Sequence, residues 1–124
     1  MFFYLFPCLF GHSNRFKAAV SVAGVANTVS MYAQSDINHG EIARWEFMGV
    51  PVLNMENFQR SSPLHYLKNC TTPTLLIHGE ADDRVPVMQS WEIYRALEDG
   101  GGFLLCFVTN CPIKHRTLII RKNS

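Results

Sequence analysis

Two adjacent carboxylates, Asp82 and Asp83, are the side chains of this 124-residue chain best placed to take part in chemistry. They follow the apolar segment Leu75–His78, which has the length and residue types of a buried strand. In open α/β sheets, functional groups cluster at the carboxyl ends of the strands. A carboxylate in that place can orient a histidine and stabilise its charged form. Alternatively, both carboxylates cap the following helix or pair with Arg84, and spacing alone favours this structural interpretation.

The cysteines, together with His115, suggest no second reactive centre. The chain has four cysteines and no CxxC pair: Cys8, Cys70, Cys106 and Cys111. This pattern is typical of free thiols in a reducing compartment, so we predict a cytoplasmic protein. Cys106, Cys111 and His115 do not have the spacing of a zinc finger. We therefore predict no metal site and no cofactor.

The elements that position the two carboxylates follow a strand, loop, helix, strand pattern. After Leu75–His78 and the polar loop, a helix is predicted from Val85 to about Asp99, where Gly100–Gly102 ends it. Apolar residues recur in it at helical spacing and predict one buried face: Val87, Trp91, Tyr94 and Leu97. The apolar segment Phe103–Val108 is predicted as the next strand. Such a βαβ unit has parallel strands and a right-handed crossover.

Earlier in the chain, Phe16–Ala23 is another short apolar run, predicted as a strand parallel to the other two. Residues 25–53 are irregular and indicate loops with short helices. Ser62 followed by Pro63 is typical of a helix start. Because Leu75–His78 is apolar throughout, we expect it to be covered on both faces. The fold class is therefore α/β, with at least three strands.

Charge and the N-terminal segment exclude several kinds of partner. Eleven basic and ten acidic residues leave a net charge of +1, which gives no footprint for nucleic acid or an anionic membrane surface. The apolar segment Met1–Phe10 would span only about 15 Å as a helix, too short to cross a bilayer. It has no basic residue before Arg15, which is unlike a signal peptide. We expect it to form a buried strand or to pack against other structure.

Four blocks of sequence, in order, resemble the catalytic domain of the prolyl oligopeptidase family, in the style of its acylaminoacyl-peptidase-like and dipeptidyl-peptidase-like members. They are RFKAAVSVAGVANTVSMY, WEFMGVP, SSPLHYLKN and TPTLLIHGEADDRVPVMQSWEIYRAL. The resemblance covers Arg15 to about Asp99. It divides the chain into a divergent apolar segment (residues 1–14), a partial catalytic domain (residues 15–102) and a divergent C-terminal segment (residues 103–124).

The resemblance implies a partial α/β-hydrolase fold, namely the C-terminal half of the parallel sheet with its flanking helices. It implies serine-type peptidase activity on peptides in intact relatives. It also implies that Asp82, the first Asp of the DDRVP block, is the acid of the catalytic triad. Asp83 and Arg84 would then support the loop.

The nucleophile of that family lies in a GxSxGG turn, and no GxSxG occurs in this chain. The nearest imitation is Gly11–Arg15, in which Arg15 stands where the second Gly belongs. The turn needs small residues because strand and helix approach closely there. Ser13 is therefore not predicted to be a nucleophile, and none is identified.

The catalytic histidine of the family lies in a GEGHG-like loop, which this chain lacks. His115 follows Asp82 by 33 residues, close to the separation in the family, and is the candidate by position. The alternative is a surface histidine between Lys114 and Arg116. His78 is predicted to be a packed residue at the end of its strand.

Two hypotheses of different classes follow. The chain is a fragment of a serine peptidase catalytic domain, inactive alone, or it is a non-catalytic α/β-hydrolase-like pseudoenzyme or regulatory module. An esterase that uses Ser13 is a third and more remote alternative. We also expect self-association, because Phe16–Ala23 would be an apolar strand without a partner on its far side.

Overall fold

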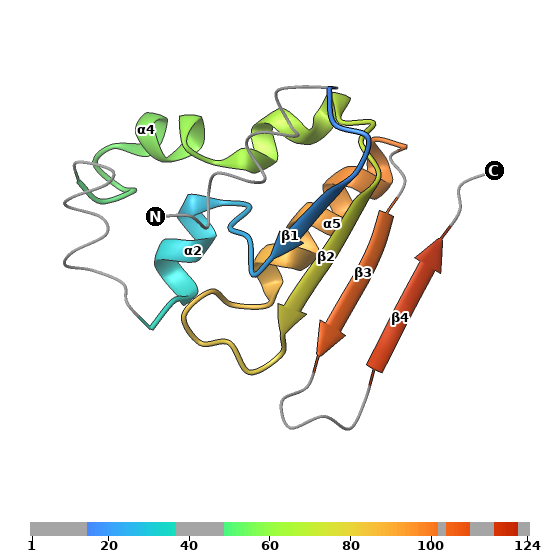
Figure 1. Ribbon diagram of the computed structural model, residues 1–124. Coiled ribbons are helices and arrows are strands. Elements are labelled where there is room, and N and C mark those ends of the chain that lie inside the picture. The colour runs from blue at the N-terminus through green and yellow to red at the C-terminus, as the bar shows by residue number, and fades with distance from the viewer. Residues whose placement is uncertain (1–14, 37–48, 102–103, 110–115, 122–124) are drawn as a thin grey trace.

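The computed structural model describes residues 15–36, 49–101, 104–109 and 116–121. Its centre is a four-stranded sheet in the order β1-β2-β3-β4, which Figure 1 shows edge to edge. The strands are β1 (Ala19–Val22), β2 (Thr74–Gly79), β3 (Leu104–Thr109) and β4 (Arg116–Arg121). β1, β2 and β3 are parallel, and β4 runs antiparallel to β3. The predicted parallel arrangement of the first three strands is confirmed.

The strand β1 is shorter than the predicted Phe16–Ala23. Its ladder begins at Ala19, whose N–H donates to the Pro73 carbonyl at 2.8 Å. It ends before Ala23, which has a φ of 47° and so leaves the extended conformation. Phe16 lies outside the strand and is largely exposed.

The strand β4 was not predicted, because the last part of the chain carries no resemblance to the family's blocks. Its sequence, RTLIIR, nevertheless holds the β-branched residues that favour a strand. An antiparallel partner needs only a short connection from β3. The local residue types at 116–121 were therefore the signal that could have found it.

The helices are α2 (Thr28–Gln34), α4 (Met55–Arg60), the 3₁₀ helix η1 (Pro63–Asn69) and α5 (Met88–Asp99). α2 begins after Asn27, whose side chain accepts a hydrogen bond from the Val29 N–H at 3.0 Å. η1 begins after Ser62 with Pro63 in its first turn, as predicted, although the Ser62 hydroxyl does not cap it. That hydroxyl donates instead to the Phe58 carbonyl at 2.8 Å.

The helix α5 starts three residues later than the predicted Val85 and ends at Asp99 as predicted. Gly101 follows with a φ of 75°, which a glycine adopts without strain. The predicted buried face is only partly right, since Val87 and Trp91 are half-buried. The buried residues of α5 are Gln89, Ser90, Ile93, Tyr94 and Leu97. Polar side chains occupy part of this face because their partners are buried with them.

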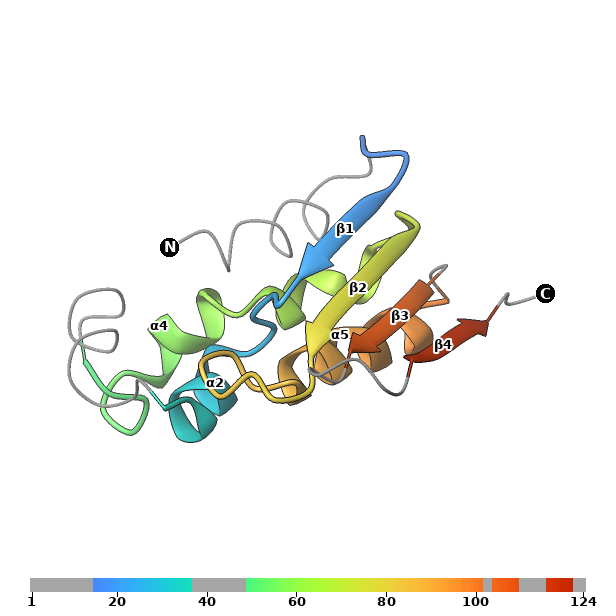
Figure 2. The same cartoon turned by 60° about the horizontal axis from the view of Figure 1, so that its bottom comes forward.

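The core lies between one face of the sheet and the helices, with α5 behind β2 and β3 in Figure 1 and beneath them in Figure 2. Ala19 and Ser21 of β1 are buried on this face, together with the alternate residues of β2: Thr74, Leu76 and His78. The residues between them are exposed or half-buried: Val20, Val22, Leu75 and Ile77. The expectation that β2 is covered on both faces is therefore not met within the described residues.

The described residues bear on two further expectations. No helix among them is long and apolar enough to cross a membrane. Cys70 is a buried free thiol. The predictions for Met1–Phe10, Cys8 and Cys111 lie outside the described residues.

Candidate functional site

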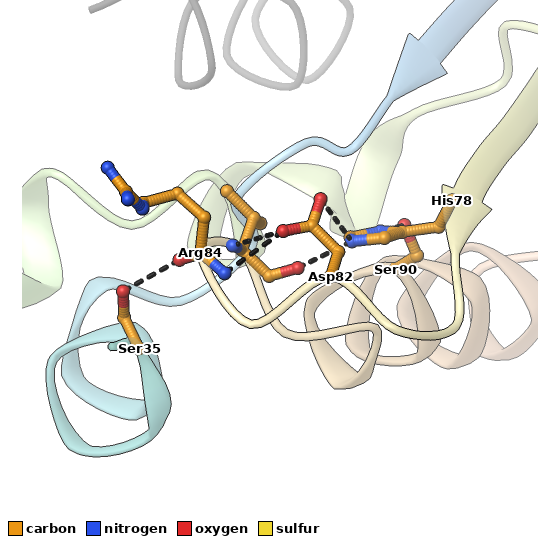
Figure 3. A network of polar contacts seen from close by, with 6 residues as sticks. Ser35, His78, Asp82, Arg84 and Ser90 are labelled. Atoms are coloured by element: carbon orange, nitrogen blue, oxygen red, sulfur yellow. Dashed lines mark hydrogen bonds and ion pairs between the residues drawn. The ribbon is translucent and has the colours of Figure 1, made fainter. Parts of the chain in front are cut away.

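The loop that joins β2 to α5 carries Asp82 and lies at the carboxyl end of β2 (Figure 3). The loop turns back on itself, and the Asp82 N–H donates to the Gly79 carbonyl at 3.3 Å. Oδ1 of Asp82 accepts hydrogen bonds from the N–H groups of Arg84, at 3.0 Å, and Val85, at 2.9 Å. One oxygen of the carboxylate therefore fixes the shape of the loop. It does not cap α5, which begins at Met88.

The other oxygen of Asp82 has a different environment. Oδ2 lies 3.9 Å from Nε2 of His78, and the Asp82 side chain is 29% exposed. Within the described part of the chain, no hydrogen bond reaches Oδ2. The carboxylate is thus held through one oxygen, while the other has no hydrogen bond from the described residues. A carboxylate oxygen of this kind can accept the N–H of a separate histidine.

His78 is packed at the end of its strand, with a fully buried side chain. Its Nε2 lies 2.6 Å from the Val85 carbonyl oxygen, and its Nδ1 lies 2.6 Å from Oγ of Ser90. The carbonyl can only accept, so Nε2 carries a proton. In the uncharged ring, Nδ1 then accepts a hydrogen bond from the Ser90 hydroxyl. Both nitrogens are engaged, which leaves His78 with a structural role.

The guanidinium of Arg84 forms no ion pair with Asp82 or Asp83. Its Nε lies 3.0 Å from Oδ1 of Asp36, just after α2. The Asp36 N–H donates to the Asp83 carbonyl at 3.1 Å, and the Ser35 hydroxyl donates to the Arg84 carbonyl at 2.6 Å. The ion pair is largely exposed and contributes little by itself. The two hydrogen bonds tie the end of α2 to the loop that carries Asp82.

A buried amide joins the start of α5 to the segment that follows β1. Oε1 of Gln89 accepts hydrogen bonds from the N–H groups of Ala26 and Asn27, each at 3.0 Å. Its Nε2 donates to the Ser30 hydroxyl at 2.8 Å. The sequence analysis missed this residue, because a glutamine at a helix start is more often exposed. Nearby, an apolar cluster of Val25, Met31 and Val85 is also buried.

The other candidate catalytic residues are not part of the site that the structure describes. Ser13 and His115 lie outside them, so the prediction for each remains a prediction. The described ranges contain no group of three or more His, Cys, Asp or Glu side chains that could hold a metal ion. The side chain of Asp83 is exposed, and its predicted role of supporting the loop stays a prediction.

Comparison with known proteins assigns the chain to a family. Residues 4–119 match the model of the prolyl oligopeptidase family. The chain is 37% identical over 91 residues to the uncharacterized peptidase YuxL of Bacillus subtilis, covering 73% of this chain and 14% of that protein. It is 34% identical over 88 residues to the acylamino-acid-releasing enzyme of Rattus norvegicus, covering 67% of this chain and 12% of the enzyme.

A solved structure gives the same result for the fold. The acylaminoacyl peptidase of Pyrococcus horikoshii superposes with a TM-score of 0.77 at 35% identity, over 86% of this chain and 17% of that one. The chain thus spans a small part of the length of the relatives it matches. Its three parallel strands and flanking helices form part of an α/β-hydrolase fold. On the match of residues 4–119, the chain belongs to the prolyl oligopeptidase family.

Proposed function

We propose that this chain forms the acid-bearing part of a serine peptidase catalytic domain, with Asp82 as the acid of the triad. The observation that supports this proposal is the unequal use of the two carboxylate oxygens. Oδ1 receives two backbone hydrogen bonds, whereas Oδ2 receives none from the described residues and belongs to a side chain that is 29% exposed. The position after β2 also matches the resemblance of the DDRVP block to the family.

In this role, Oδ2 of Asp82 accepts the N–H of a catalytic histidine. The acid selects the ring tautomer whose other nitrogen can take a proton from a serine hydroxyl. It then stabilises the imidazolium that forms while the serine oxygen attacks the carbonyl of the substrate. Asp82 itself does not need to change its protonation state. His78 cannot be that histidine, because both of its nitrogens are engaged inside the core.

The substrates we propose are peptides, including N-acylated peptides, because relatives are named acylamino-acid-releasing enzyme and acylaminoacyl peptidase. No GxSxG sequence occurs in the chain. We therefore expect the 124-residue chain alone to show no hydrolysis of peptides or esters above background. A serine-reactive phosphonate probe tests this expectation. Stoichiometric labelling at Ser13 would contradict it and favour the esterase alternative.

The second candidate function is a non-catalytic α/β-hydrolase-like module. The absence of a GxSxG turn and of a GEGHG-like histidine loop from the sequence favours it. The two candidates differ in one respect, which is whether Asp82 can support turnover when a nucleophile and a histidine are supplied.

A hybrid enzyme tests this difference. Residues 15–101 would replace the matching segment of the Pyrococcus horikoshii acylaminoacyl peptidase, which retains its own nucleophile. We expect the hybrid to hydrolyse an N-acylated peptide substrate. Asp82→Asn should lower kcat by about 10⁴-fold, because the histidine loses its orienting acid.

Asp83→Asn is the matched control, since it removes the neighbouring carboxylate, whose side chain is exposed. We expect it to leave kcat within about twofold, as surface substitutions away from a site do. An active hybrid in which Asp82→Asn keeps its turnover would reject Asp82 as the triad acid and favour the non-catalytic module.

A further inference from the structure

The two backbone N–H groups that hold Oδ1 of Asp82 belong to residues whose carbonyl oxygens are held as well (Figure 3). The Arg84 carbonyl accepts the Ser35 hydroxyl at 2.6 Å. The Val85 carbonyl accepts Nε2–H of His78, also at 2.6 Å. These two donors come from the end cap of α2 and from β2, on either side of the loop. The backbone under Asp82 is therefore fixed from two directions.

The Ser35 bond acts on the same peptide group that binds Asp82. The Arg84 carbonyl and the Val85 N–H belong to one peptide unit, which is planar and rigid. Ser35 holds the oxygen of this unit, and Oδ1 of Asp82 accepts from its N–H at 2.9 Å. Fixing the oxygen sets the direction of the N–H. The bond to the oxygen also polarises the unit and strengthens its N–H as a donor.

Ser35 is itself well placed to act as an anchor. It is the residue that ends α2, is 5% exposed, and its N–H donates to the Met31 carbonyl at 3.0 Å. The next residue, Asp36, binds the Asp83 carbonyl through its own N–H. At its other end, α2 is tied to α5 through Gln89. The hydroxyl of Ser35 thus extends from an element that is fixed at both ends.

We propose that Ser35 is a positioning residue for Asp82, acting through the Arg84–Val85 peptide unit. The inference deepens the proposed function, on which its catalytic meaning rests. Its structural content, that Ser35 controls the hydrogen bonding of Asp82, can be tested in the 124-residue chain without any turnover.

Hydrogen–deuterium exchange at low micromolar concentration, followed by mass spectrometry of peptides that contain the Arg84 and Val85 amides, provides the test. We expect Ser35→Ala to accelerate exchange there about five-fold to ten-fold, the effect of one lost hydrogen bond. The acceleration should exceed any change in peptides from β2 and α5. Ser35→Thr keeps the hydroxyl and should restore slow exchange.

Ser30→Ala is the matched control. It removes a hydroxyl from α2 that is hydrogen-bonded to Glu92 and Gln89 and not to the loop of Asp82. Its effect on the Arg84 and Val85 amides should not exceed its effect elsewhere. Asp82→Ala should accelerate exchange of these amides as Ser35→Ala does. The double variant should add little to the larger single effect, since both changes remove the same arrangement.

Several results would overturn the inference: equal acceleration over the whole chain in Ser35→Ala, no rescue by threonine, or additive effects of Ser35→Ala and Asp82→Ala. An unprotected loop in the parent chain would overturn it as well. In the hybrid enzyme, Ser35→Ala should lower kcat about tenfold with KM unchanged. If exchange behaves as expected but Asp82→Asn leaves turnover intact, the proposed function fails while the structural role of Ser35 stands.

Discussion

The two faces of the sheet are built from alternate residues of the same strands, yet they differ in an unexpected way. The face toward the helices buries polar side chains, including Ser21, Thr74 and His78. On the opposite face, Val20 and Val22 are exposed, at 45% and 63%. Hydrophobicity alone would have assigned these faces the other way round. Of these three, His78 bonds to the loop of Asp82 through the Val85 carbonyl, whereas the Thr74 hydroxyl donates to the Thr72 carbonyl. The Ser21 hydroxyl makes no hydrogen bond to the described residues. The comparison teaches that packing against the helices, and not hydrophobicity alone, decides which face is buried.

The largest difference between the faces should appear in a matched pair of leucines on β2. Leu76 is fully buried and Leu75 is half-buried. Leu76→Ala should lower the free energy of unfolding by about 3 kcal/mol, because it removes apolar contacts and leaves a cavity. Leu75→Ala should lower it by about 1 kcal/mol, in proportion to the smaller area lost from burial. Urea denaturation measures both, and equal losses would mean that both faces are covered.

A substitution of Gln89 tests whether a buried polar side chain contributes as much to stability as a buried leucine does. Gln89→Leu leaves the Ala26 and Asn27 N–H groups without their acceptor, and should cost about 2–3 kcal/mol of unfolding free energy. Gln59→Leu, at an exposed position of α4, is the control and should change stability by less than about 0.5 kcal/mol. Thermal and urea denaturation give these values. A neutral Gln89→Leu would show that these hydrogen bonds are not needed for stability.

A substitution of Ala23 tests whether the backbone is strained in the turn that follows β1. Its φ of 47° disfavours a residue with a Cβ atom. Ala23→Gly should therefore raise the free energy of unfolding by about 0.5–1 kcal/mol. Ala33→Gly, at an exposed position of α2, should lower it by about 1 kcal/mol. If both substitutions destabilise equally in urea titrations, Ala23 is not strained in solution.

A substitution in the edge strand β1 should have the smallest effect on stability, and its main effect is measured as a change in self-association. We expect the purified chain to self-associate, since β1 ends the described sheet and two of its four side chains are exposed valines. Val22→Lys should shift the sedimentation distribution toward monomer while changing stability by less than about 0.5 kcal/mol. A parent chain that sediments as a single monomer and unfolds cooperatively would contradict this expectation.

Much of the fold could be predicted because its signals are local. The run TLLIH and the helix that ends before Gly100 each show their period and punctuation within a few residues. β4 was missed although its residue types favour a strand. The covering of each face could not be predicted, because it depends on which distant elements pack against the sheet.

The site divides in the same way. Asp82 could be found from its position after a strand and from the resemblance of its block. Ser35 could not, because the carbonyl that it binds lies 49 residues further along the chain. Gln89 binds backbone groups that are 62 and 63 residues away. No local pattern distinguishes a serine or glutamine with such a partner from one that faces solvent.

The most direct test of the account compares two substitutions of Asp82 in the hybrid enzyme, with turnover and stability measured on the same samples. Asp82→Asn keeps an oxygen for the Arg84 and Val85 N–H groups, so its free energy of unfolding should stay within about 0.5 kcal/mol. Asp82→Ala should lose about 1–2 kcal/mol with those bonds. Both should lose turnover to the same extent, by about 10⁴-fold. A loss of turnover that follows the loss of stability, small in Asn and large in Ala, would contradict the assignment of Asp82 as the triad acid.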